Sequence, residues 1–231
     1  MRNAFLDALT ALGKSDSRIR LVCADIGYES SFHRELPDQF VNVGVAEQIM
    51  VGMAAGMALR GLIPFCYTIA PFALYRPFEF IRNDVCLQNL PVTIVGMGAG
   101  MSYPTLGRTH QAMEDLTVAR ALGLRLLTPC DPRETMECVR YIAKHPEPTY
   151  LRLGKAGEPD LTSNAEPFVY GVPRLLKRGS SHLIAGYGPI LSKASQIDPE
   201  ASVVSIHSHP ATLHPHSRLT VLEDHKPFLL V

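Results

Sequence analysis

The chain has no tryptophan, no pair of cysteines at CxxC spacing and no excess of charge of either sign. Its 22 basic and 22 acidic side chains cancel, so electrostatics gives no reason to expect binding to nucleic acid or to an anionic membrane. Glycine and proline interrupt every apolar run before it reaches the roughly 18 residues of a membrane span. The N-terminus also lacks the continuous apolar core of a signal peptide. We therefore expect partners that are neither nucleic acid nor membrane.

The five cysteines give no sign of a disulfide framework. Their number is odd, and most lie in apolar runs such as "RLVCAD" and "IPFCYT", where a thiol behaves as a small hydrophobic group. This use of cysteine is typical of a reducing compartment. We therefore expect a cytoplasmic protein.

Apolar residues are abundant. Hydrophobic residues make up 46% of the 231 positions and charged residues only 19%, which favours a globular protein with a large core. The length suits one large domain, or one domain with a smaller one attached. A neutral chain this rich in apolar residues is also a candidate for burial against partner subunits.

Short apolar runs alternate with segments of helical periodicity. Continuous Val/Ile/Leu runs are typical of strands that are covered on both faces, and their alternation with helices predicts an α/β fold with a mostly parallel sheet and helices on both faces. We expect strands at 20–25, 40–44, 62–68, 91–98, 124–130 and 148–153, and helices at about 3–13, 46–60, 72–89, 113–121 and 132–145.

One helix start is well marked in "CDPRETMECVRYIAKH". Asp131 is the expected N-cap, Pro132 occupies the first helical position, and Glu134 is placed to complete a capping box.

Composition also divides the chain. Residues 1–156 hold the main α/β pattern, 157–166 are a polar, turn-rich linker, and 167–231 hold a second and smaller β/α pattern. In the second part we expect strands in "HLIAGYG", "SVVSIHS" and "LTVLED" and a short helix near 189–196. This part is small for an independent domain.

A carboxylate stands near the start of an unusually apolar helix. The segment "FVNVGVAEQIMVGMAAGMALRG" at 40–61 has no polar face, is expected to be buried on all sides, and is closed by Gly61. Glu47 in such a place has two explanations. It is either a structural carboxylate, paired with an arginine or favoured by the helix N-terminus, or a group held for proton chemistry.

An ordered set of motifs links this segment to a known family. They are "FVNVGVAEQIMVGMAAGMALRGLIPFCYT", "FEFIRNDVCLQNLPVTIVGMGAG", "GRTHQAMEDLTVAR", "LTPCDPRE" and "PTYLRLGKAG". Over about residues 20 to 157 the chain resembles the pyrimidine-binding domain of transketolases, especially the separate C-terminal-half subunits of split bacterial transketolases. The resemblance implies the thiamine-diphosphate-binding fold.

The resemblance gives Glu47 a role, because it matches the glutamate of the family's "VAEQ" motif. That glutamate contacts N1′ of the aminopyrimidine ring of thiamine diphosphate. A protonated carboxyl at N1′ favours the imino tautomer, whose nitrogen then removes the C2 proton of the thiazolium ring. Desolvation keeps the shared proton in place at neutral pH.

The resemblance implies four further cofactor contacts. Phe72 and Tyr75, in "YTIAPFALY", match two of the three aromatics that pack against the pyrimidine, and Ile69 replaces the third. Isoleucine can cover the ring face but adds no aromatic stacking. Asp25, just after a strand, matches an aspartate that approaches the cofactor. From the residues alone, helix packing explains Phe72 and Tyr75, and a turn explains Asp25.

The expected substrate side departs from the sugar-phosphate pattern. His110, in "GRTHQ", matches a histidine near the reacting carbonyl, where an imidazole can move protons or stabilise an alkoxide. Leu106 replaces an aspartate that contacts substrate hydroxyls, Gly98 replaces a substrate-holding histidine, and Lys155 replaces a phosphate-binding arginine. Arg108 adds a cation where a small residue or proline is common in the family. These changes predict a non-standard substrate.

The chain contains no "GDG…N" motif, which in this family holds Mg²⁺ and the diphosphate. The resemblance therefore implies a second subunit that carries the diphosphate-binding domain and most of the contacts to thiamine diphosphate and Mg²⁺. An α2β2 assembly follows by analogy.

The tail resembles a shortened transketolase C-terminal domain in "SVVSIHSHPATL" and "LTVLEDH". Five histidines between positions 207 and 225 are dense enough to suggest metal spacing, but no cysteine lies nearby, so we expect no metal site; they are His207, His209, His214, His216 and His225.

We expect a transketolase-like transferase that moves a two-carbon ketol or acyl unit and is active only with its partner. Two alternatives remain open. One is a β-type subunit of a 2-oxoacid dehydrogenase or a deoxyxylulose-phosphate-synthase-like enzyme, which share the domain. The other is a catalytically degenerate assembly subunit. The residues name neither donor nor acceptor.

Overall fold

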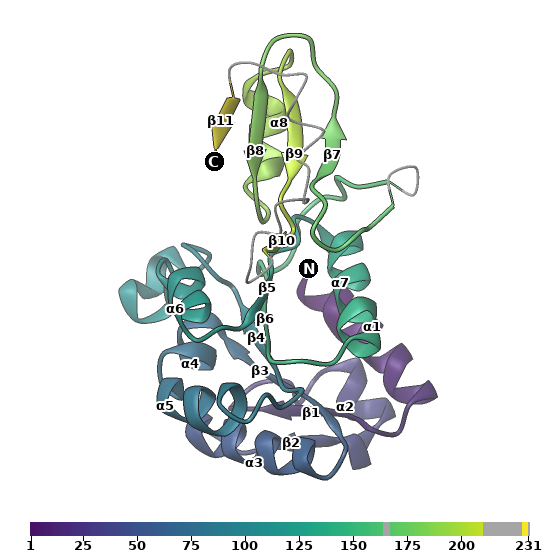
Figure 1. The fold of residues 1–231 in the computed structure, drawn as a ribbon, viewed down its shortest axis with the longest axis vertical. Helices are drawn as coiled ribbons and strands as arrows, with labels where there is room; N and C mark the ends of the chain where they lie inside the picture. The colour runs from purple at the N-terminus through teal and green to yellow at the C-terminus, as the bar shows by residue number, and fades with distance from the viewer. Residues whose placement is uncertain (164–166, 210–227, 231) are drawn as a thin grey trace.

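The computed structural model describes residues 1–163, 167–209 and 228–230. Its larger part is a seven-stranded sheet in the order β10-β5-β6-β4-β3-β1-β2, flanked by helices (Figure 1). All strands but β10 run parallel, which confirms the predicted α/β class with a mostly parallel sheet. The strands are β1 (Ile19–Cys23), β2 (Phe40–Asn42), β3 (Ile63–Ile69), β4 (Thr93–Met97), β5 (Arg125–Leu127), β6 (Thr149–Arg152) and β10 (Ser208–His209).

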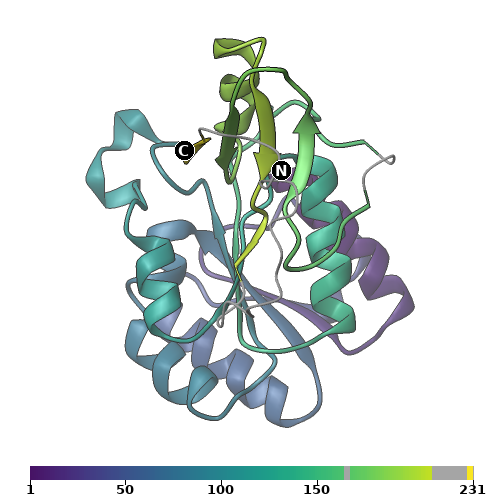
Figure 2. The same ribbon diagram turned by 45° about the horizontal axis from the view of Figure 1, so that its top comes forward.

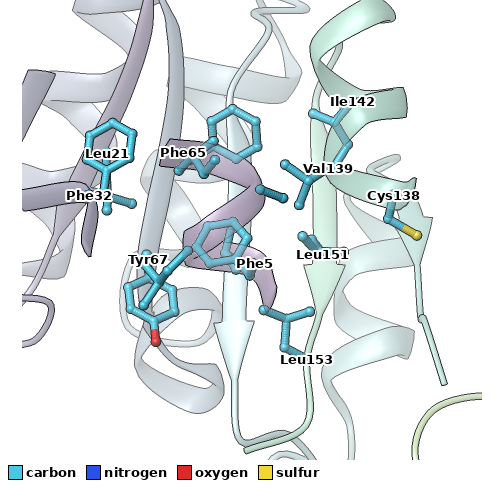
Figure 3. Close-up of a cluster of buried hydrophobic side chains, with 14 of the residues drawn as sticks. Phe5, Leu21, Phe32, Phe65, Tyr67, Cys138, Val139, Ile142, Leu151 and Leu153 are labelled. Atoms are coloured by element: carbon cyan, nitrogen blue, oxygen red, sulfur yellow. The ribbon is translucent and has the colours of Figure 1, made fainter. Parts of the chain in front are cut away.

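Helices cover both faces of this sheet. On one face α1 packs beside α7, and Phe5 of α1 stacks on Tyr67 of β3 with a ring-centroid distance of 5.3 Å (Figure 3). On the other face α3, α4, η2 and α6 bury a second apolar cluster. The helices are α1 (Arg2–Ser15), α2 (Ser31–Glu35), η1 (Pro37–Gln39), α3 (Glu47–Leu59), α4 (Ala70–Leu74), α5 (Phe78–Phe80), η2 (Ile81–Cys86), η3 (Pro104–Leu106), η4 (Arg108–His110), α6 (Asp115–Ala121) and α7 (Pro132–Lys144).

The helix predicted at 72–89 is wrong as one continuous element. The segment forms α4, α5 and the π-helical η2, with a break at Pro77. Proline has no backbone N–H and its ring clashes with the preceding turn, so it ends the helix. The short helix α2 was not predicted, although Ser30 caps it by accepting a hydrogen bond from the His33 amide at 3.1 Å.

The start of α7 follows the prediction with one change. Asp131 is the N-cap, and its Oδ1 accepts from the Glu134 amide at 2.6 Å. The Glu134 carboxylate, however, accepts from the amide of Cys130, one residue before the cap. It also accepts from the Ser205 hydroxyl at 3.0 Å, so Glu134 joins the first sheet's helix to the second part of the chain.

The second part contains a four-stranded sheet in the order β11-β8-β9-β7, with α8 beside it (Figure 2). The expected strands in "HLIAGYG" and "SVVSIHS" correspond to β8 and β9, whereas the expected strand in "LTVLED" lies outside the described residues. Strands β7, β10 and β11 were not predicted. The elements are β7 (Arg174–Lys177), β8 (Leu183–Gly186), α8 (Leu191–Ile197), β9 (Ser202–Ser205) and β11 (Phe228–Leu230).

A polar joint connects the two sheets. The buried Asp131 carboxylate, beyond its capping bond, accepts from the amides of Leu161 and Thr162 at 2.7 and 2.6 Å. After β9 the chain returns to the first sheet, where the backbone carbonyl of His207 accepts from the Thr128 amide at 2.8 Å and β10 pairs with β5. The linker is thus fixed to the start of α7, and the segment that follows β9 is fixed to the first sheet.

His207 should make the joint sensitive to acid. It is 1% exposed and stacks on Phe168, and burial lowers its pKa to about 3. Because an unfolded histidine titrates near 6.5, the unfolded state binds more protons between those values, and stability falls as pH drops from about 6.5. We expect His207→Phe, which keeps a ring against Phe168, to flatten the fall in melting temperature between pH 6.5 and 4.5. An unchanged slope would contradict this role. Burial also lowers the pKa of His209, to about 4, so His209 contributes to the same fall and accounts for part of the slope that remains in His207→Phe.

No helix among the described residues is long and apolar enough to cross a membrane. Nor do these residues contain three His, Cys, Asp or Glu side chains grouped to hold a metal ion. His214, His216 and His225 of the histidine-rich tail lie outside the described residues.

Candidate active site

Glu47 is the first residue of α3 and is 3% exposed. Asn42 shapes the approach to it, because its Oδ1 accepts from the Gly44 amide at 2.9 Å and its Nδ2 donates to the carbonyl of Ile26 at 2.8 Å. At its other end α3 closes as predicted at Gly61, which has φ +82° and forms the paired hydrogen bonds of a Schellman motif. The carboxylate is therefore held at the start of a well-defined helix.

The expectation that this segment is buried on all sides is wrong for the single chain. One side of α3 and the residue before it expose large apolar side chains: Val45 is 68% exposed, Ile49 58% and Met53 38%. The opposite side packs Met50, Val51 and Ala54 into the core. The apolar residues of α3 thus form two faces, one packed into the core and one exposed. The sequence alone does not show which apolar residues belong to which face.

Arg76 contacts two of the predicted cofactor residues at once. Its Nη1 donates to Glu47 Oε1 at 2.8 Å, and its guanidinium carbon lies 4.0 Å from the centroid of the Phe72 ring. A planar, nitrogen-bearing cation thus pairs with the carboxylate and covers the aromatic face. The arginine side chain is 43% exposed, and its departure would uncover the Glu47 carboxylate and the Phe72 ring face. A buried carboxylate beside an aromatic face fits an aminopyrimidine, which needs the same two contacts.

The predicted aromatic residues lie in α4 and at its end. Phe72 meets His110 edge to face, with ring centroids 5.0 Å apart. Tyr75 donates its hydroxyl to Glu114 at 3.2 Å, and burial raises the pKa of this phenol, with the nearby Asp115 adding to the rise. Ile69 ends β3 and is half-buried against the core.

The loop that carries His110 follows β4. His110 lies in η4, where its Nδ1 is 2.9 Å from the Thr109 hydroxyl. Leu106 is 53% exposed, and the guanidinium of Arg108 lies 3.8 Å from the Glu114 carboxylate. At the end of the loop, the buried Asp115 fixes the chain to the sheet.

That anchor consists of two contacts to one carboxylate oxygen. Asp115 Oδ2 accepts from the Tyr150 hydroxyl at 2.9 Å and from Arg152 Nε at 2.8 Å, both from β6. Because Asp115 begins α6, this cluster fixes the end of the loop to the carboxyl end of β6.

Tyr103 occupies the space beside Gly98. A Cβ added to Gly98 would lie 2.3 Å from the Tyr103 ring, and Gly98 has φ +68°, which L side chains rarely adopt. The family's histidine therefore cannot simply be restored at this position. Lys155 Nζ lies 4.7 Å from the centroid of the same ring, and His110 is 6.2 Å from it.

Asp25 lies two residues after the end of β1. It is exposed, has φ +56°, and lines a cavity of about 630 Å³ together with Tyr67 and Met97. A left-handed conformation is uncommon for a residue other than glycine and often marks a constrained functional turn. Arg2 and Arg34 line the cavity together with the carboxylates of Asp7, Asp25 and Glu29, so the cavity carries charges of both signs.

The structure thus brings Glu47, Phe72, His110 and Lys155 into one chain of contacts, joined by Arg76 and Tyr103. Asp25 follows β1 and Ile69 ends the neighbouring strand β3, and Leu106 and Arg108 lie on the exposed loop that carries His110. Sequence reasoning missed Arg76, Tyr103, Asn42 and the two cavity arginines. Only Arg76 carried a usable signal, a cation immediately after the aromatic segment "YTIAPFALY".

Comparison with known proteins identifies the family of this chain. The profile of the transketolase pyrimidine-binding domain matches residues 1–157. An apulose-4-phosphate transketolase subunit from Phocaeicola vulgatus is 35% identical over 84% of this chain, which spans 64% of that relative. A 6-deoxy-6-sulfo-D-fructose transketolase subunit from Clostridium sp. is 31% identical over 84% of this chain and 62% of its own length.

Among solved structures, a split-gene transketolase in an inactive beta4 tetramer superposes with a TM-score of 0.80 and 35% identity, over 90% of this chain and 71% of that one. The chain spans less than two thirds of the two curated relatives named above. By the match over residues 1–157, it belongs to the transketolase family and contains that family's pyrimidine-binding domain.

Proposed function

We propose that this chain is the pyrimidine-domain subunit of a two-chain transketolase-like enzyme that transfers a two-carbon ketol or acyl unit. The observation that carries the proposal is the Glu47 carboxylate, buried at the start of α3 beside the face of Phe72. The proposed cofactor is thiamine diphosphate with Mg²⁺, which when bound supplies a carbanion that attacks the substrate carbonyl.

The chain's own residues would bind and orient the cofactor's ring. Glu47 would share a proton with the ring nitrogen that faces it, after Arg76 leaves the carboxylate. Phe72 and Ile69 would cover the ring faces, and Tyr75 would fix the segment through Glu114. Asp25 would approach the cofactor from the end of β1. His110, beside Phe72, would hold or move a proton at the substrate oxygen.

A partner subunit accounts for two features. The chain lacks the family's diphosphate-binding motif, and the exposed apolar side chains on and beside α3 form a surface suited to a protein neighbour; they are Val45, Ile49, Met53 and Leu59. We propose that a second subunit carrying the diphosphate-binding domain docks there in an α2β2 assembly. The inactive beta4 state of the similar split-gene transketolase supports the need for such a partner.

The proposed substrate is not an ordinary pentose phosphate. Leu106 offers no hydrogen bond to a sugar hydroxyl, and Lys155 cannot make the bidentate contact of an arginine. Two relatives are transketolase subunits named for apulose 4-phosphate and for a sulfonated fructose, which supports an unusual sugar. The free cysteines, most of them buried, support a cytoplasmic location.

The test of this proposal is cofactor binding with and without the partner. We expect the isolated chain to bind thiamine diphosphate and Mg²⁺ barely or not at all, because the diphosphate ligands lie elsewhere. The complex with its "GDG"-bearing partner should bind at micromolar concentrations or below. Calorimetry on the chain, on the partner and on the complex measures this. Micromolar binding by the isolated chain would refute the split site, and no binding by the complex would refute the cofactor.

A further inference from the structure

We infer that Tyr103 is a specificity-determining residue and that Tyr103 and Gly98 act as one unit. The Tyr103 ring forms an apolar wall of the substrate site. This wall selects an anionic sugar in which the carbon that lies against the ring carries no hydroxyl group. The inference rests on the proposed function and names the substrate class of that site.

The first step is steric. Gly98 follows β4, and the Tyr103 ring packs so close to it that an added Cβ would meet ring atoms at 2.3 and 3.1 Å. A substitution at either position alone should therefore lower the stability of the fold. A side chain at 98 needs a smaller residue at 103, and loss of the ring at 103 leaves a hollow above Gly98.

The second step concerns what the unit offers a substrate. The Tyr103 hydroxyl donates to the Met97 thioether at 3.1 Å, so its proton is directed toward the core. The half-buried ring lies edge to face with His110, at 6.2 Å between centroids. The surface beside the His110 imidazole is therefore aromatic carbon of Tyr103, which offers no hydrogen-bond partner to a hydroxyl group of the substrate. A buried hydroxyl without a partner is disfavoured.

The third step concerns charge. Lys155 is exposed and its ammonium lies 4.7 Å from the Tyr103 centroid, so the ring positions this cation next to the same wall. An anionic sugar can thus place its charged end at the Lys155 ammonium while a carbon without a hydroxyl group lies against the Tyr103 ring.

The steric unit is tested by a double-mutant cycle on the melting temperature of the isolated chain. The variants are Gly98→Ala, Tyr103→Ala and the two combined. The strain of alanine at φ +68° is common to both backgrounds and cancels, so the cycle isolates the contact with the ring. We expect Gly98→Ala to lower the melting temperature by about 5 °C more when Tyr103 is present. Additive effects would overturn the unit.

Specificity is tested in the assembled complex with a matched pair of probes. Ribose 5-phosphate and 2-deoxyribose 5-phosphate differ by one hydroxyl, and the readout is the ratio of their kcat/KM values as acceptors, with inhibition constants as a second measure. We expect the wild type and Tyr103→Phe to favour the deoxy sugar alike, because both keep the ring. Tyr103→Ala should shift the ratio toward ribose 5-phosphate by about tenfold, since water can then solvate the hydroxyl.

Two outcomes would overturn this assignment: an unchanged ratio in Tyr103→Ala, or a Tyr103→Phe shift as large as that of Tyr103→Ala. The second would place selectivity on the phenol hydroxyl and not on the ring. Failure of the proposed function gives a different result, because the wild-type complex would then neither bind thiamine diphosphate nor exchange its C2 proton. The melting cycle is independent of both and still decides whether Gly98 and Tyr103 are coupled.

Discussion

Replacing Glu47 by glutamine should lower kcat of the assembled enzyme by about a hundredfold or more and leave the fold intact. The amide has the shape of the carboxyl, and its oxygen can still accept the hydrogen bond from Arg76. It cannot share a proton with a ring nitrogen as an acid does. The measurement is the rate of C2-proton exchange of thiamine diphosphate bound to the complex, followed by deuterium incorporation.

The matched control is Glu35→Gln, the same change at an exposed carboxylate that pairs with Lys14. It should leave the exchange rate near that of the wild type. If Glu47→Gln also exchanges at the wild-type rate while still binding the cofactor, Glu47 has no part in proton chemistry. The ion pair with Arg76 is then its whole role.

The second prediction with a large effect is a low rate of the standard transketolase reaction between pentose phosphates. The complex should convert xylulose 5-phosphate and ribose 5-phosphate at well below about 1 per second, the lower end of ordinary enzyme rates. The reason is that Leu106 offers no acceptor to a sugar hydroxyl. Leu106→Asp should raise kcat/KM for this exchange by about tenfold or more, because a site that bonds a hydroxyl discriminates strongly for it.

Leu106→Ala is the control, since it shortens the side chain without adding a polar group. Leu106 is 53% exposed, so neither substitution should disturb the core. Two results would contradict the altered-substrate proposal. One is a wild-type complex that runs the pentose exchange at ordinary rates, and the other is an equal gain from alanine and aspartate.

Much of the fold could be predicted because local signals and the sheet agree. The strands of the first sheet are short apolar runs, and Asp131 and Pro132 mark the start of α7 by cap chemistry alone. The failures have physical causes. Pro77 divides a segment whose apolar pattern is continuous. Strand β10 consists of only Ser208 and His209, which show no apolar pattern, and it pairs with β5, which is far away in the sequence.

The site was predictable in part for a different reason. Glu47, Phe72 and His110 stood in motifs, and the structure places their side chains near one another, although their roles stay predictions. Tyr103 could not be found from sequence, because its importance comes from the missing side chain at Gly98, and only coordinates show that one ring fills that space. The exposed side of α3 was missed because core and interface positions are apolar alike.

The return of the chain from β9 to β10 has a consequence for the edge of the large sheet. β5 pairs with β6 on one side and with β10 on the other, so the antiparallel strand covers backbone groups that would otherwise be open. An open edge of this kind is a template for intermolecular strand pairing. The second part of the chain therefore blocks strand pairing between molecules at the edge of β5, and cutting at the linker to isolate residues 1–156 would expose that aggregation-prone edge.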